Sequence, residues 1–112
     1  MTYGPPYWAL LAGTLLAAAG QLAFKLGATG RASLPEFLNL WIASGLVLYG
    51  LGTMLWIFAL SRLSLTVVYP FTALTFVLVF CAGVFLLGES ATSMQFWGVG
   101  FVLLGLFLIT TG

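Results

Sequence analysis

Residues 65–87 read LTVVYPFTALTFVLVFCAGVFLL and contain no charged side chain. The run is longer than the roughly 20 residues that an α-helix needs to cross a hydrocarbon core about 30 Å thick. Because lipid offers no hydrogen-bond partner to peptide groups, a segment that crosses it must pair its backbone internally, as a helix does. This stretch therefore predicts a membrane-spanning helix and sets the class of the whole fold.

The composition of the chain agrees with that prediction. Of its 112 residues, 62% are hydrophobic and only 4% are charged, whereas soluble domains carry about 25% charged residues. The five charged residues are Lys25, Arg31, Glu36, Arg62 and Glu89. Five charges cannot coat the surface of a water-soluble domain of this length, so the sequence predicts an integral membrane protein.

Turn-forming residues divide the chain into four apolar segments. We predict helices over about 7–26, 34–60, 65–87 and 93–109, within a single domain that covers residues 1–112. Because the connections are short, neighbouring helices should be antiparallel, and the fold class is all-α, an up-down bundle of four transmembrane helices. The lysine and arginine residues divide almost evenly between the two sides, so they leave the membrane orientation open.

Local signals mark the start of three of these segments. Prolines 5 and 6, after Gly4, suit the first turn of a helix. Ser33 and Glu36 have the spacing of a capping box, in which each residue satisfies a backbone N–H group of the other, and Thr92 and Gln95 repeat that spacing.

The residue types also narrow the chemistry. The chain has no histidine or aspartate, and its single cysteine, Cys81, lies in an apolar run. We therefore expect no metal site, no disulfide and no Cys–His nucleophile within one chain. A net charge of +1 provides no basic surface for nucleic acid. We expect a protein that is not an enzyme and that needs no cofactor.

Residues 17–27, AAAGQLAFKLG, place an amide and a cation one helical turn apart in an apolar helix. Gln21 and Lys25 share a stripe with Thr14. At 1.5 Å per residue, Gln21 lies roughly 7 Å from the membrane midplane and Lys25 roughly 13 Å. Lys25 could therefore reach the head groups as an anchor. Gln21 needs polar partners inside the protein, and this favours a cavity lined by both residues.

The third segment carries a second polar group around a proline. Pro70 has no backbone N–H group, so we predict a kink that frees a carbonyl near Thr66. Tyr69 and Thr72 share one face, where their hydroxyls could reach a ligand or that carbonyl. A purely structural kink is the alternative. Within one chain, Tyr69 should lie toward the opposite membrane face from Lys25.

Small residues recur at helix-face spacing in three of the four segments. In lipid, such positions let two helix backbones approach closely. They predict packing within the chain or, on the last segment, contact between two subunits, so we expect a dimer. The residues are Gly13, Ala17 and Gly20 in the first segment, Gly45 and Gly52 in the second, and Gly98 and Gly105 in the last, the predicted dimer interface.

Four motifs carry a resemblance to a known family. They are GQLAFK at 20–25, ALSRLSLTVVYPFTALTFVLV at 59–79, LGES at 87–90 and QFWGVG at 95–100. Together they resemble the drug/metabolite transporter superfamily in its smallest, four-helix form. The small multidrug resistance exporters of that superfamily carry a glutamate where this chain has Ala17. The likeness is closer to the subunits that flip aminoarabinose-phosphoundecaprenol, which share the Gly-Gln-Leu plus lysine pattern and the Tyr-Pro pair.

The resemblance implies a multi-pass transporter of the bacterial inner membrane, a flippase that moves a lipid-linked sugar phosphate between leaflets. It also implies a homodimer or a heterodimer with a paralogue, surrounded by membrane lipids. Lys25, as a lone embedded cation, suits the phosphodiester of a polyprenyl phosphate, with Gln21, Tyr69 and Thr72 as further substrate-binding residues. Two alternatives stay open: an exporter of small molecules, and an assembly subunit that transports nothing.

Overall fold

The computed structural model describes residues 6–112, and within that range the protein is all-helical. Four helices there are long and apolar enough to cross a membrane, which confirms the predicted all-α class with four transmembrane helices. Gly4 and Pro5 lie outside the described residues, and Pro6 directly precedes the first helix. The elements are α1 (Tyr7–Ala28), the 3-10 helix η1 (Leu34–Phe37), α2 (Leu40–Leu60), α3 (Leu65–Val68), α4 (Phe71–Phe85) and α5 (Ser93–Thr111).

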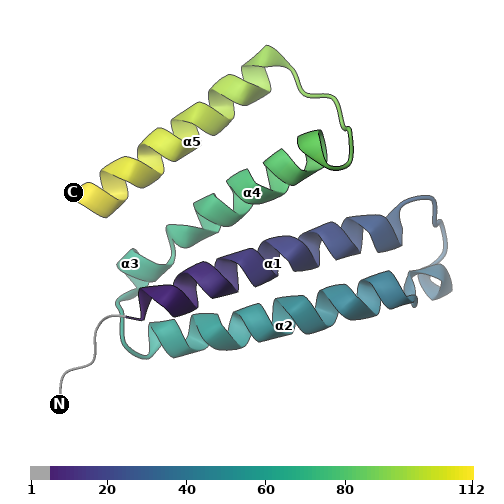
Figure 1. The fold of residues 1–112 in the computed structure, drawn as a ribbon, viewed down its shortest axis with the longest axis horizontal. Coiled ribbons are helices and arrows are strands. Elements are labelled where there is room, and N and C mark those ends of the chain that lie inside the picture. The colour runs from purple at the N-terminus through teal and green to yellow at the C-terminus, as the bar shows by residue number, and fades with distance from the viewer. Residues whose placement is uncertain (1–5) are drawn as a thin grey trace.

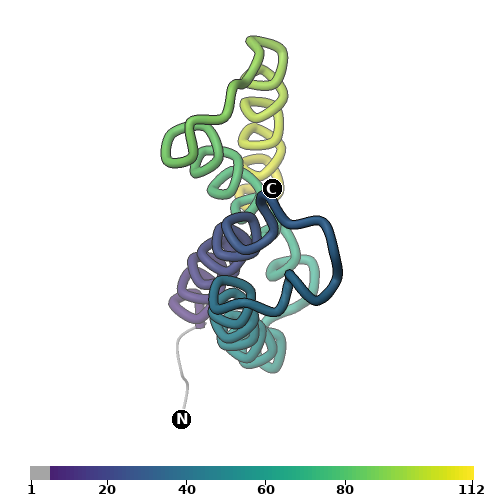
Figure 2. Tube along the Cα trace, turned by 90° about the vertical axis from the view of Figure 1, so that its right-hand side faces the viewer, coloured from purple at the N-terminus to yellow at the C-terminus, as the bar shows by residue number. Residues whose placement is uncertain are grey.

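The spanning helices lie side by side in a curved row (Figures 1 and 2). Helix α1 packs along α2 on one side and along α4 on the other, and α5 packs on α4. The chain reverses direction at each connection, so the start of α1 and the end of α5 lie at the same end of the molecule (Figure 1). The molecule measures 51 × 35 × 19 Å. The row leaves α5 at an open flank.

Glycines hold α1 and α2 together at backbone distance. A Cβ atom on Gly13 would lie 3.0 Å from the carbonyl oxygen of Gly52, and one on Gly20 would lie 3.0 Å from that of Gly45. Helices that approach this closely in lipid gain dispersion contacts along their whole length. The small-residue stripes of the first two segments therefore pack within the chain.

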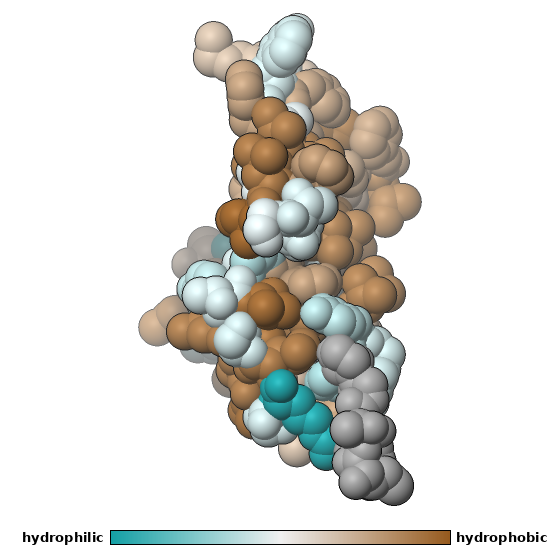
Figure 3. Space-filling view, turned by 90° about the vertical axis from the view of Figure 1, so that its left-hand side faces the viewer, coloured by the Kyte–Doolittle hydropathy of each residue, from teal (hydrophilic) through white to brown (hydrophobic). Residues whose placement is uncertain are grey.

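A small apolar core closes one end of the molecule. Ala9 and Leu10 of α1, Ala59 of α2 and Val68 of α3 are buried together there. Elsewhere, large apolar side chains are exposed along all four spans, whereas the end face seen in Figure 3 mixes hydrophobic with hydrophilic residues. An apolar surface of this extent fits contact with lipid.

The second helix begins later than the sequence pattern suggests. Ser33 and Glu36 form their capping box on the short η1, where the Glu36 carboxylate accepts hydrogen bonds from the backbone N–H groups of Ala32 (2.7 Å) and Ser33 (3.3 Å). These donors hold the pKa of Glu36 below its ordinary value. Helix α2 starts only after Asn39, whose side chain accepts from the backbone N–H group of Ile42.

The third span is interrupted at Tyr69 and Pro70. Helix α3 ends at Val68 and α4 begins at Phe71, because Pro70 cannot donate the hydrogen bond that would continue the helix. The last span begins with the capping box that the sequence predicts, in which the side chains and backbone N–H groups of Thr92 and Gln95 pair reciprocally.

Candidate functional site

A cavity of about 280 Å³ lies over the middle of α1, between α2 and α4. We call it the hydroxyl cavity, because threonine and tyrosine side chains make up most of its polar lining and no charged residue lines it. Its polar residues are Thr14, Gln21, Tyr49, Thr53, Tyr69, Thr72 and Thr75, and Trp56, Gly13, Ala17 and Gly52 complete the lining.

A second cavity, of about 410 Å³, lies between the end of α1 and the end of α4. Lys25 and Gln21 line it from α1, Gly83 lines it from α4, and Glu89 lines it from the connection to α5. We call it the lysine cavity. Gln21 lines both cavities, so this residue lies where the two sites meet.

Lys25 has a carboxylate partner in the lysine cavity. Its Nζ atom lies 3.6 Å from Oε2 of Glu89, so the prediction of a lone embedded cation is wrong. The side chains are 56% and 49% exposed, and ion pairs as exposed as this one contribute only about 0–1 kcal/mol. An anionic ligand could therefore replace Glu89 at little cost.

The fold of the connection between α4 and α5 explains how Glu89 reaches Lys25. Helix α4 ends at Phe85, and the chain then turns back through Gly88, whose φ of 71° lies in the left-handed region that favours glycine. The backbone N–H group of Glu89 donates to the carbonyl of Gly83 (3.0 Å). A Cβ atom on Gly83 would lie 2.8 Å from Oε1 of Glu89, so glycine leaves room for the carboxylate.

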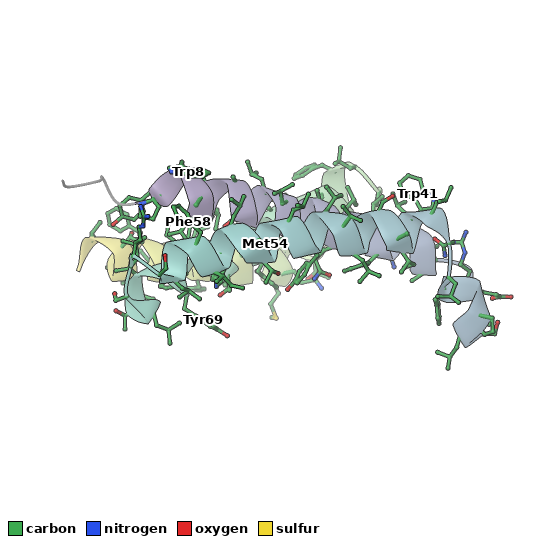
Figure 4. All side chains as sticks on the ribbon, turned by 90° about the horizontal axis from the view of Figure 1, so that it is seen from below. Trp8, Trp41, Met54, Phe58 and Tyr69 are labelled. Atoms are coloured by element: carbon green, nitrogen blue, oxygen red, sulfur yellow. The ribbon has the colours of Figure 1, made fainter. Side chains whose placement is uncertain are left out.

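The predicted site residues fall into two groups. Gln21, Tyr69 and Thr72 meet at the hydroxyl cavity, whereas Lys25 lines the lysine cavity. Tyr69 projects from the α3 end, on the opposite side of the helices from Trp8 and Trp41 (Figure 4). The Thr72 hydroxyl donates to the carbonyl of Tyr69 at 2.7 Å, and not to the carbonyl near Thr66 that the sequence suggested.

Helix α2 supplies cavity residues that the sequence analysis missed. Tyr49, Thr53 and Trp56 line the hydroxyl cavity from the side opposite Thr72. They recur every three or four residues in an apolar helix, which is the spacing of one helix face. That spacing was the signal available in the sequence.

The last helix contributes to neither of these cavities. A Cβ atom on Gly98 or Gly105 would meet no atom of another element within 4 Å, and α5 contains no buried residue. The predicted interface glycines therefore face open space within the described part of one chain. No group of three or more His, Cys, Asp or Glu residues between positions 6 and 112 could hold a metal ion.

Comparison with known proteins identifies the family. The sequence profile of the EamA-like transporter family matches residues 1–111. The chain belongs to this family. The predicted membership of the drug/metabolite transporter superfamily is thereby confirmed, and the four apolar spans are those of a multi-pass membrane transporter. No solved structure matches this EamA-like chain.

Curated relatives of this EamA-like transporter are named as flippase subunits. A probable 4-amino-4-deoxy-L-arabinose-phosphoundecaprenol flippase subunit ArnE of Serratia proteamaculans is 36% identical over 87% of this chain and 88% of its own length. The ArnE subunit of Yersinia pestis strain Pestoides F is 37% identical over 93% and 95%. The ArnF subunit of Yersinia enterocolitica is 41% identical over 70% of this chain and 61% of its own length.

Proposed function

We propose that this EamA-like transporter is a flippase subunit that moves a polyprenyl-phosphate-linked sugar across the bacterial inner membrane. The names of its relatives support a lipid-linked sugar as the substrate. The observation that carries the proposal is the position of Lys25. This cation lines a cavity beside Gln21, at the end of an otherwise apolar span.

The chemistry of the lysine cavity suits a phosphodiester. The Lys25 ammonium provides a point charge with three hydrogen-bond donors, and the Gln21 amide adds two more donors. Charge-assisted hydrogen bonds of this kind are about twice as strong as neutral ones. The polyprenyl chain would stay in the lipid, against the apolar outer faces of the helices.

Glu89 acts in this scheme as the partner that Lys25 keeps while no phosphate is bound. A bound phosphate would displace it, because two anions beside one ammonium group repel each other. Glu89 therefore competes with the substrate and lowers its apparent affinity. The exposure of both side chains keeps this competition weak.

Transport requires more enclosure than one row of helices provides. The open flank at α5, with Gly98 and Gly105 free of contacts from other elements, supports a dimer in which α5 meets a second subunit. The relatives include two differently named subunits, which supports a heterodimer with a paralogue beside the homodimer.

The proposal is tested by titrating a fluorescent polyprenyl-phosphate sugar into the purified protein in lipid nanodiscs. Lys25→Ala should weaken binding about ten- to a hundredfold, because a charge-assisted contact contributes about 1.5–3 kcal/mol. Lys25→Arg should retain much of the affinity. Gln21→Leu should weaken binding less than Lys25→Ala does. It should leave the fold at least as stable, because it removes a polar group from the apolar region.

Two carboxylate variants serve as a matched pair. Glu89→Gln should raise the affinity about two- to fivefold by removing the competitor. Glu36→Gln makes the same change of charge at a residue that lines neither cavity, and it should have no effect.

Two outcomes would contradict the proposal. The first is that folded Lys25→Ala and Gln21→Leu both bind the probe within twofold of the unmodified protein. Lys25 would then be a membrane anchor. Resistance of cells to quaternary ammonium dyes, lost in Lys25→Ala, would instead make the protein a multidrug exporter.

A further inference from the structure

One buried hydroxyl in the hydroxyl cavity has no partner in the protein. Thr14 is 1% exposed, and its Oγ1 atom is the one buried side-chain nitrogen or oxygen within residues 6–112 that makes no hydrogen bond. Nearly all buried polar groups in proteins are paired, and leaving one unpaired costs about 1–3 kcal/mol. Thr14 lines the hydroxyl cavity, so this cost is located at a possible binding site.

The other threonines of the cavity already use their hydroxyl hydrogens. The hydroxyls of Thr53, Thr72 and Thr75 each donate to a backbone carbonyl three or four residues earlier in the chain, at 2.9, 2.7 and 3.3 Å. Their oxygens keep lone pairs that can accept a hydrogen bond. The lining therefore presents a free donor at Thr14, acceptors at three threonines, and both kinds of group at Gln21.

The rest of the lining indicates the class of ligand. No charged residue lines the hydroxyl cavity, and the rings of Tyr49, Trp56 and Tyr69 supply flat apolar surfaces beside the hydroxyls. The volume of about 280 Å³ is near the lower end, about 300 Å³, of small-molecule sites. Hydroxyls together with aromatic faces complement a sugar ring, which has hydroxyls at its rim and C–H groups on its faces. An ammonium group there would lack a carboxylate partner.

We propose that the hydroxyl cavity binds an uncharged sugar ring and that the Thr14 hydroxyl donates a hydrogen bond to it. The inference rests on the proposed function, in which the phosphate binds at Lys25. Gln21 lines both cavities and lies at the junction of sugar and phosphate. The head group is thus oriented, with its phosphate toward the end of α1 and its ring toward Tyr69.

The test compares two lipid-linked phosphodiesters, one with and one without a sugar. One is undecaprenyl methyl phosphate, and the other is undecaprenyl phosphate carrying a neutral pyranose, each titrated into the protein in nanodiscs. Thr14→Val keeps the shape of the side chain and removes the hydroxyl. It should weaken binding of the glycosylated lipid about three- to tenfold and leave binding of the methyl phosphodiester unchanged. Thr14→Ser, which keeps the hydroxyl, should bind both probes nearly as well as the unmodified protein.

Thr110→Val is the matched control, because Thr110 lies on α5 outside both cavities and donates within its own helix. It should change neither affinity. Thr14→Val should also unfold at the same or a higher temperature without ligand, since the hydroxyl it removes has no partner. A lower unfolding temperature would show that the hydroxyl has a structural partner and would overturn the inference.

The two probes separate this inference from the proposed function. Lys25→Ala should weaken both probes, because both carry the phosphate. If Thr14→Val weakens the binding of neither probe, or of both probes equally, the proposed sugar site is wrong and the proposed phosphate site is unaffected. If Lys25→Ala leaves both affinities unchanged, the proposed function fails, whatever Thr14→Val does.

Discussion

The α1–α2 pair and helix α5 use glycine in opposite ways. Gly13 and Gly20 on α1 are seven residues apart, as are Gly98 and Gly105 on α5. The first two meet the backbone of α2, whereas the second two meet no other element. Of an apolar stretch of 18 residues in each helix, 33% is buried inside the chain in α1 and 6% in α5. Equal spacing therefore identifies a face that allows close approach, and the surrounding helices decide what approaches it.

Two connections lie on the side of Lys25, one between α1 and α2 and one between α4 and α5. They differ in how firmly they are attached to α1. In the first, the Asn39 amide donates to the carbonyls of Gly27 and Glu36, each at 3.0 Å, while its oxygen accepts from Ile42. One side chain thus fixes α2 to the end of α1. In the second, Glu89 reaches α1 only through its half-exposed ion pair with Lys25. Hydrogen bonds thus attach the first connection to the end of α1, whereas the second contacts α1 through an exposed ion pair.

The largest expected effect comes from filling the glycine contact of the first pair. Gly20→Leu would place its Cβ atom 3.0 Å from the Gly45 oxygen and 3.1 Å from the Tyr49 nitrogen. Backbone atoms cannot move aside as side chains do, so we expect a loss of about 3 kcal/mol or more, or a misfolded protein. Thermal unfolding in detergent and the yield of monodisperse protein measure it.

Gly105→Leu is the control for that experiment, since it makes the same substitution on the open flank. It should leave the unfolding temperature nearly unchanged and weaken disulfide crosslinking between subunits in membranes, as Gly98→Leu should. If Gly105→Leu unfolds the protein as Gly20→Leu does, the contrast between the two helices is lost. If the protein is monomeric in lipid and still transports its substrate, the predicted dimer is wrong.

A smaller effect is expected at the first connection. Asn39→Ala removes an N-terminal cap of α2 together with the bond to Gly27, and it should lower the free energy of unfolding by about 1–2 kcal/mol. Asn39→Asp keeps the accepting oxygen and loses the donated hydrogen bonds. Its free energy of unfolding should therefore lie between those of Asn39→Ala and the unmodified protein. An unfolding temperature for Asn39→Ala equal to that of the unmodified protein would show that the connection does not hold α1 to α2.

The smallest effect concerns pH at the same connection. The folded state lowers the pKa of Glu36. The ionised carboxylate therefore stabilises the folded protein fully above the ordinary glutamate pKa of about 4.3, and this stabilisation is lost as the pH falls through the lower pKa of the folded state. The amide NMR signals of Ala32 and Ser33 should therefore shift with a midpoint below about 4.3. They should not titrate in Glu36→Gln. A midpoint at or above the ordinary value would contradict the hydrogen bonds to the carboxylate.

Much of the fold could be predicted because lipid leaves few choices. Long apolar runs identify the spans, and the Thr92–Gln95 spacing marks the start of α5 as observed. The start of α2 could not be found this way. Residues 34–38 are apolar enough to continue the helix, and the break depends on Asn39 reaching Gly27 across the connection.

The candidate site was only half predictable, for a similar reason. The stripe of Thr14, Gln21 and Lys25 follows from helix geometry alone, and all three line cavities. Their partners come from elsewhere. Glu89 reaches Lys25 because the chain turns back after α4, and the α2 residues of the hydroxyl cavity depend on which face α2 turns toward α1. The spacing of the α2 residues shows that they share a face, but the packing of the helices decides what that face meets.

The glycine contact between α1 and α2 also bears on the order in which the protein is made. Both partners lie within the first 60 residues, so their contact can form in the bilayer while the rest of the chain is still on the ribosome. At about 5–20 residues per second, the remaining residues follow about 3–10 s later. Helix α4 then meets a finished hairpin and completes the cavities. Helix α5, with its open flank, is synthesised after the other three spans, so a second subunit that contacts α5 would meet a chain whose cavities are already assembled.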